Sequence, residues 1–218
     1  MIVDKEISDE IKKSLVDYIK RIYLIILGLG FSYFIIKFFD GVYGTYQLIY
    51  FFSIYYFISY DWTAYIILIN RYPYKISSNI LSQGRFYSDY FALVLKGGLI
   101  FLSSLTIIAP PNIVSTGTLF SIATLFLLWH FTIIAWFYFA KKEYTESSNE
   151  YRELSKNWWP HSIMIIFYCL YIFVLRFYQI KNPILLTLYF VLCMAIVVFA
   201  TWRRKNLIEK LEENNNSM

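Results

Sequence analysis

Long apolar runs occupy most of the chain between residues 22 and 202. Each run reaches or approaches the ~20 residues that an α-helix needs to cross ~30 Å of hydrocarbon. The runs are continuous and lack the period-two alternation of barrel strands, so they predict membrane-spanning helices. We expect an all-α bundle of six transmembrane helices, at about residues 22–39, 46–70, 90–109, 114–140, 160–179 and 184–202.

Short turns and longer connections alternate between these runs. The turns are rich in Gly, Pro and Asn and predict three helix hairpins; they lie at residues 41–45, 110–112 and 181–183. The two longer connections, residues 71–89 and 141–159, then lie on the same side of the membrane as both termini.

The chain before the first span has a different pattern. Ile7, Ile11 and Leu15 recur every four residues among acids and lysines. This spacing predicts a cytoplasmic amphipathic helix over residues 1–20, lying on the membrane or against a partner. A solvated extension of the first span fits the pattern equally well. The expected division is therefore this helix, a transmembrane domain at 21–202 and a cytoplasmic tail at 203–218.

Basic residues give the bundle a direction. Sixteen of the 20 Lys and Arg residues fall in the terminal segments and the two longer connections, and three fall on the opposite side. By the positive-inside rule, both termini face the cytoplasm, and we expect a multi-pass protein of the plasma membrane. Only 16% of residues are charged, against about 25% in soluble domains. The net charge of +5 collects at helix ends, so it does not indicate a nucleic-acid partner.

Signatures of catalysis and metal binding are missing from the sequence. There is no zinc-type Cys/His spacing, no glycine-rich phosphate loop and no serine nucleophile elbow. Cys169 and Cys193 both fall in apolar runs, where cysteine is typically a packing residue. We therefore predict no catalytic residue, metal or cofactor, and the sequence favours a protein that is not an enzyme.

Three ionisable residues lie deep within predicted spans. Asp61 is in the second span, Lys96 in the third and His130 in the fourth. Each is ten or eleven residues from a basic residue at the cytoplasmic end, or roughly 15 Å at the rise of a helix. Charges at this depth are costly and normally find partners inside a bundle, so we expect Asp61 to pair with Lys96 and His130 to lie near them.

Two further features concern the third and fifth spans. Asp89, Lys96 and Ser103 are spaced by seven, so they share one helix face. That face predicts either a water-filled path or a surface buried against other helices. Trp158 and Trp159 precede the fifth span and are typical of interfacial anchors.

Several functions fit this pattern. The first is a channel or transport protein, forming a homo-oligomer in the lipid bilayer and using Asp61, Lys96, His130, Asp89 and Ser103 for permeation. A membrane effector gated by a soluble cytoplasmic partner is a variant of it. The second is a non-conducting anchor whose buried charges only fix helix register. The third is a lipid-modifying enzyme with an acid-base site at Asp89, Arg85 and His161.

Overall fold

The computed structural model describes residues 2–39, 45–71, 74, 84–108, 116–143, 158–178 and 183–216. Predictions for the turns and for most of the two longer connections lie outside these residues. The helices are α1 (Ile2–Phe39), α2 (Thr45–Arg71), α3 (Gly84–Ile108), α4 (Thr116–Glu143), α6 (Trp159–Phe173), the π-helical η3 (Val174–Tyr178) and α7 (Pro183–Asn216). The described part of the chain contains no strand, which confirms the all-α prediction.

Five helices are long and apolar enough to cross a membrane. Their candidate spans are Val16–Ile36, Thr45–Asn70, Gly84–Ser103, Gly117–Lys142 and Trp159–Phe177. The predicted sixth span coincides with a shorter apolar stretch, Ile184–Phe199, inside the longer helix α7. The structure therefore supports a multi-pass bundle with five clear spans, and a sixth span stays a prediction.

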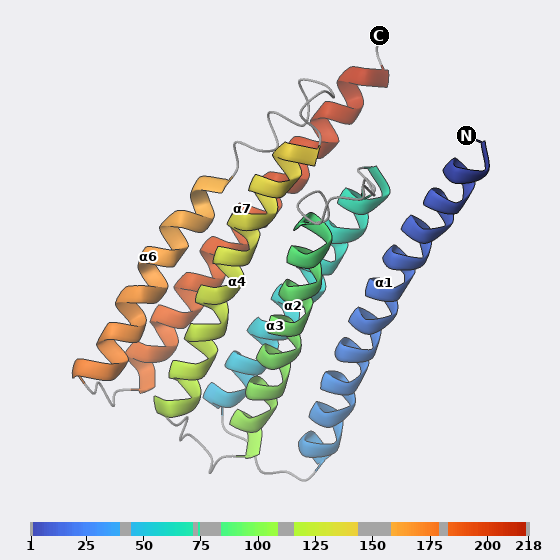
Figure 1. The fold of residues 1–218 in the computed structure, drawn as a ribbon. Helices are drawn as coiled ribbons and strands as arrows, with labels where there is room; N and C mark the ends of the chain where they lie inside the picture. Colours follow the sequence, from blue (N-terminus) through green and yellow to red (C-terminus); the bar gives the residue numbers. More distant parts are fainter. Residues whose placement is uncertain are drawn as a thin grey trace.

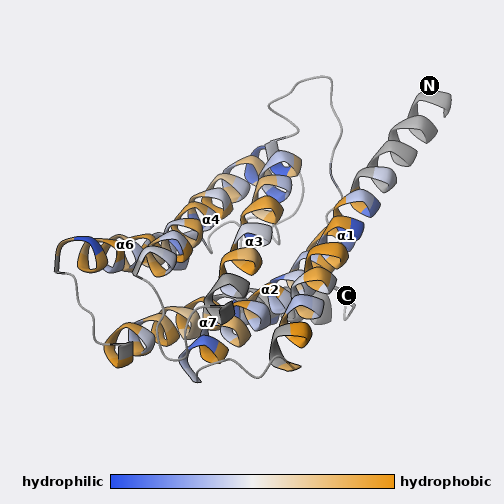
Figure 2. Cartoon of the chain, turned by 90° about the horizontal axis from the view of Figure 1, so that it is seen from below, coloured by the Kyte–Doolittle hydropathy of each residue, from blue (hydrophilic) through white to orange (hydrophobic). Residues whose placement is uncertain are grey.

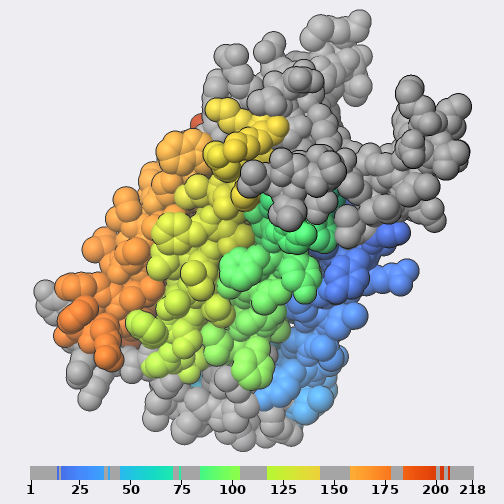
Figure 3. All heavy atoms as spheres, in the orientation of Figure 1, coloured from blue at the N-terminus to red at the C-terminus, as the bar shows by residue number. Residues whose placement is uncertain are grey.

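The helices form a bundle of up-and-down neighbours with both termini at one end (Figure 1). One face shows α1, α3, α4 and α6 side by side (Figure 3). Behind this face, α2 packs against α3 and α7, and α7 packs against α6. Because α3 contacts α1, α2 and α4, its polar face is enclosed by three other helices.

Two predicted boundaries differ from the structure. The N-terminal segment and the first span form one continuous helix, α1, as the alternative of a helical extension expects. The third helix begins at Gly84, so Arg85 and Asp89 belong to α3. The connection predicted at residues 71–89 is therefore too long at its end, and Arg85 is instead a residue of α3 whose side chain is only 1% exposed.

Large apolar side chains cover much of the outside of the bundle. Leu29, Phe101, Ile166 and Leu188 are each more than 60% exposed and come from four different helices. Apolar residues recur along every helix in the hydropathy view (Figure 2). Such a surface suits a hydrocarbon solvent, in which exposed apolar side chains carry no hydration penalty. The interior is also mainly apolar and aromatic, so its few charged groups are conspicuous.

Candidate functional site: a polar column inside the bundle

Asp61 and Lys96 form the ion pair that the sequence predicts. The ammonium of Lys96 on α3 donates a hydrogen bond to Oδ2 of Asp61 on α2, and both side chains are almost fully buried. Asp61 lies ten residues from the end of α2, or about 15 Å, which places the pair near the middle of a ~30 Å hydrocarbon layer. Pairing is the arrangement that makes two such charges tolerable at this depth.

A tyrosine that the sequence did not single out completes the pair. The hydroxyl of Tyr23 on α1 donates to Asp61 Oδ2 at 3.2 Å, and its ring lies 4.7 Å from the Lys96 ammonium. One side chain thus offers an O–H donor to the acid and a π face to the base. Tyr23 was missed because tyrosine is common along this chain, and only the packing of α1 on α3 makes this one special.

Glycines let the neighbouring helices come close to Lys96. A Cβ added at Gly97 would lie 3.4 Å from Ile26 of α1, and one at Gly98 would lie 3.0 Å from Leu125 of α4. Small residues at helix interfaces permit this approach in membrane bundles. The two glycines therefore hold the helices on both sides of α3 close around the buried lysine.

A second polar group lies about two helical turns from Lys96 along α3, toward the end of the bundle at which both chain termini lie. Asp89 accepts hydrogen bonds from the Tyr74 hydroxyl at 2.8 Å and from the Trp136 indole N–H at 3.0 Å. The Arg85 guanidinium lies over the rings of the same two residues, 4.8 Å from Tyr74 and 5.9 Å from Trp136. An acid and a base thus share one pair of aromatic partners.

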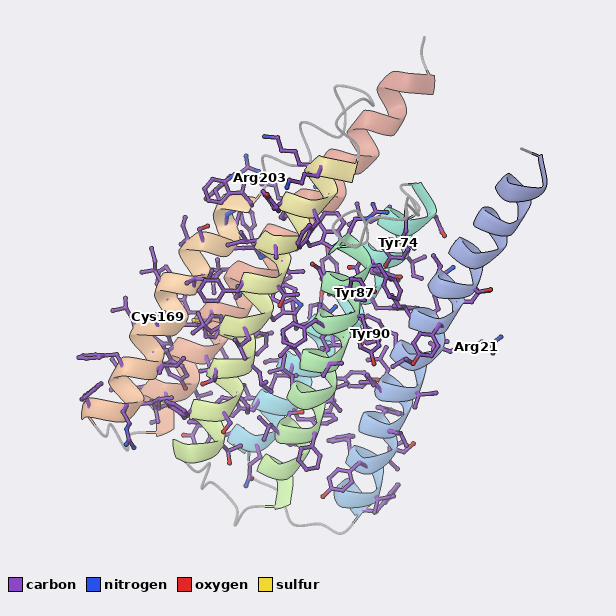
Figure 4. The ribbon with its side chains drawn as sticks, viewed as in Figure 1. Arg21, Tyr74, Tyr87, Tyr90, Cys169 and Arg203 are labelled. Carbon is purple, nitrogen blue, oxygen red and sulfur yellow. The ribbon has the colours of Figure 1, made fainter. Side chains whose placement is uncertain are left out.

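Tyr74 links this group to the connection between α2 and α3. It lies outside the candidate spans and near the bundle end that carries the termini (Figure 4). Its hydroxyl is also 3.2 Å from that of Tyr65. Burial, followed by the negative charge of Asp89, raises the pKa of Tyr74 well above its ordinary value. The hydroxyl therefore remains a protonated donor at neutral pH, and its contribution to stability is lost only as pH rises above about 10.

A small cavity connects the two groups. All four charged residues, Asp61, Arg85, Asp89 and Lys96, line it together with Tyr23, Tyr65 and Trp136. Its volume is about 30 Å³. A water molecule in a cavity needs ~10–15 Å³ on this measure, so the space accommodates about two waters. The charges of the lining sum to zero.

Among the described residues, apolar side chains follow the Asp61–Lys96 pair in the interior. The buried side chains that follow it along α2 and α3, Ile58, Ile54 and Leu99, are apolar. Ser103, farther along the polar face of α3, is buried, and its hydroxyl donates to the carbonyl of Ile100 at 2.8 Å. The shared face of Asp89, Lys96 and Ser103 thus lies inside the bundle, while the continuous polar part reaches only its middle.

His130 does not join this column, contrary to expectation. Its Nδ1 lies 3.1 Å from Nδ1 of His161 on α6, and its ring is 5.5 Å from that of Tyr168. The depth of His130 in the membrane matches that of the Asp61–Lys96 pair. Depth alone, however, does not determine which neighbouring helix a side chain of α4 faces. The same contact places His161 beside His130, whereas Asp89 and Arg85 share Tyr74 and Trp136 as partners.

The predicted anchors lie at the start of α6. Trp158 and Trp159 are 49% and 43% exposed. The Arg203 guanidinium of α7 is 5.6 Å from the Trp159 ring, at the bundle end that carries the termini (Figure 4). An exposed tryptophan beside an arginine is typical of the membrane–water interface.

Among the described residues, no group of three or more His, Cys, Asp or Glu side chains could hold a metal ion. The candidate site is the polar column, with its paired charges, aromatic donors and small cavity. No protein-family model, no curated protein and no solved structure matches this chain.

Proposed function

We propose that this chain is a small multi-pass transport protein of the plasma membrane, of carrier or gated-channel type. The observation that carries the proposal is the column from Tyr74 to Asp61 and Lys96 around a water-sized cavity. Ionisable residues inside a bundle are costly and commonly mark pathways for ions or protons.

The path that we propose lies within one protomer. The column is enclosed by α1, α2, α3 and α4 of the same chain. In this proposal, the apolar layer formed by Ile58 and Leu99 closes the path beyond the Asp61–Lys96 pair. Transport then requires that the helices separate or shift at this layer. We retain homo-oligomerisation and a cytoplasmic position of the termini as further parts of the proposal.

Reconstitution tests this proposal. Purified protein in liposomes is assayed for flux of protons, monovalent cations and anions, with Asp61→Asn and Lys96→Met beside the wild type. We expect flux in the wild type and altered flux in both variants. Chromatography in detergent checks that each variant is folded. Absence of every flux in well-folded wild-type protein, under all imposed gradients, would refute transport.

A second candidate is a non-conducting anchor for a soluble partner. It is favoured by the polar helix ends: α1 begins before its apolar part at Val16, and α7 continues beyond Phe199 to Asn216 (Figure 1). Both extensions lie at the same end of the bundle. Pull-down from native membranes tests this function, with loss of the partner expected when residues 1–17 are deleted. Unchanged capture after the deletion would count against docking at α1.

A further inference from the structure

We infer that the species moved through the polar column is the proton, relayed by water between Asp89 and Asp61. This inference rests on the proposed transport function and names its substrate. It follows from the size of the cavity, the chemistry of its lining and the apolar layer of Ile58 and Leu99 beyond it.

Size is the first argument. The cavity of about 30 Å³ holds about two waters, which is less than a hydrated metal ion or an organic solute needs. A proton needs no space of its own, because it moves by exchange of covalent and hydrogen bonds along waters and side chains. The column in this closed state therefore has room for water and for a proton relayed along it.

The lining supplies groups that can exchange protons at both ends. Asp61 and Asp89 both border the cavity. Asp89 and Lys96 are seven residues apart on α3, which corresponds to about 10 Å of rise. Two waters and the reach of two carboxylates can bridge such a gap. Tyr65 and Tyr74, whose hydroxyls lie 3.2 Å apart, extend the hydrogen-bonded groups toward the end of the bundle.

The transfer is balanced within the column. A proton that enters beside Tyr74 binds a carboxylate oxygen of Asp89, and the waters pass a proton on to Asp61. An O–H bond forms at Asp61, its negative charge disappears, and Lys96 loses its counter-ion. When the apolar layer of Ile58 and Leu99 opens, Asp61 releases this proton to water on the opposite side, so that the new O–H bond breaks and the pair with Lys96 re-forms. No electron is transferred and no other reactant is needed.

This cycle gives the ion pair a role in gating. While Asp61 is ionised, Lys96 and Tyr23 bind it and tie α3 and α1 to α2. Protonation weakens both contacts, directly beside the apolar layer of Ile58 and Leu99. The arrival of a proton and the loosening of the closed layer are therefore linked through the same carboxylate.

Proteoliposomes provide the experiment. A potassium gradient with valinomycin drives protons inward, and an enclosed pH indicator records acidification; parallel assays follow Na⁺ and Cl⁻. We expect proton flux in the wild type and none of the other ions. The variant Asp61→Asn/Lys96→Gln, which removes both charges together, should slow proton flux by about 100-fold, the lower end of the contribution of a positioned proton-transfer group.

Two controls separate relay from folding. Asp61→Glu keeps the carboxylate and should retain proton flux. Asp17→Asn removes a carboxylate that does not line the cavity and should leave the flux unchanged.

The outcomes are distinct. Undiminished proton flux in the folded double variant would overturn the inference. Flux of Na⁺ or Cl⁻ without protons would overturn it too, while the proposed transport function would stand. A wild type that passes no ion at all would remove both.

Discussion

The Tyr23 hydroxyl lies 3.2 Å from Oδ2 of Asp61, so a residue of α1 completes an ion pair made between α2 and α3. α1 packs mainly on α3 and much less on α2. Tyr23 is thus the point at which the first helix is joined to the polar interior of the bundle.

The first prediction concerns this contact. Tyr23→Phe removes the O–H donor and keeps the ring, and we expect a loss of about 1.5–3 kcal/mol of stability, the usual range for a hydrogen bond to a charged group. Thermal unfolding in detergent measures the change. Tyr56→Phe is the matched control, because Tyr56 is 58% exposed on the outside of α2. Equal midpoints for the two variants would contradict the assigned role.

The second prediction concerns the buried charges. Lys96→Gln leaves Asp61 charged without its ammonium partner, and removal of one member of a buried pair typically costs about 3–5 kcal/mol. The double variant Asp61→Asn/Lys96→Gln leaves no lone charge, so we expect it to be more stable than either single variant. A double-mutant cycle of denaturant unfolding gives the coupling. Simple additivity would show that the two groups do not interact in the folded protein.

The third prediction compares two glycines of α1. A Cβ at Gly30 would collide with the side chain of Ile100 on α3, whereas nothing lies within 4 Å of a Cβ at Gly28. Ile100 is β-branched and adjusts poorly. Gly30→Ala should therefore destabilise the bundle, and Gly28→Ala should stabilise it by up to about 1 kcal/mol through helix propensity. Unfolding midpoints of the two variants check the signs, and a gain at Gly30 would refute the close packing.

The fourth prediction concerns the imidazole pair. His161→Phe leaves Nδ1 of the buried His130 without the partner that lies 3.1 Å away, and we expect a cost of about 1–3 kcal/mol. His130→Phe/His161→Phe removes both polar rings and should recover part of this loss. Unfolding of the two variants in detergent tests the pair. A double variant less stable than the single one would indicate that His130 does not depend on His161.

The same variants distinguish the histidine pair from the column. Neither histidine lines the cavity between Asp61 and Asp89. Proton flux should therefore persist in folded His161→Phe protein, measured in the same liposome assay. Loss of flux there would mean that the pathway also runs between α4 and α6.

The membrane character, the helical class and most helix positions could be predicted from the amino-acid sequence alone. Uninterrupted apolar runs of this length lie in lipid, which offers the backbone no hydrogen-bond partners. Each segment must therefore pair its own N–H and C=O groups as a helix. The pairing of Asp61 with Lys96 also followed, because two opposite charges at one depth have few other partners. The seven-residue spacing placed Asp89, Lys96 and Ser103 on one face of α3, and Lys96 and Ser103 on that face are buried.

Which neighbouring helix each polar side chain contacts could not be predicted from the sequence and follows from the packing of the helices. The rotation of α4 turns His130 toward His161 and Trp136 toward Asp89, although the depth of His130 had suggested the central pair. The early start of α3 buries Arg85, which the sequence placed in a loop. Depth follows from counting residues along one helix, but orientation depends on close packing between helices, to which glycines such as Gly97 and Gly98 contribute.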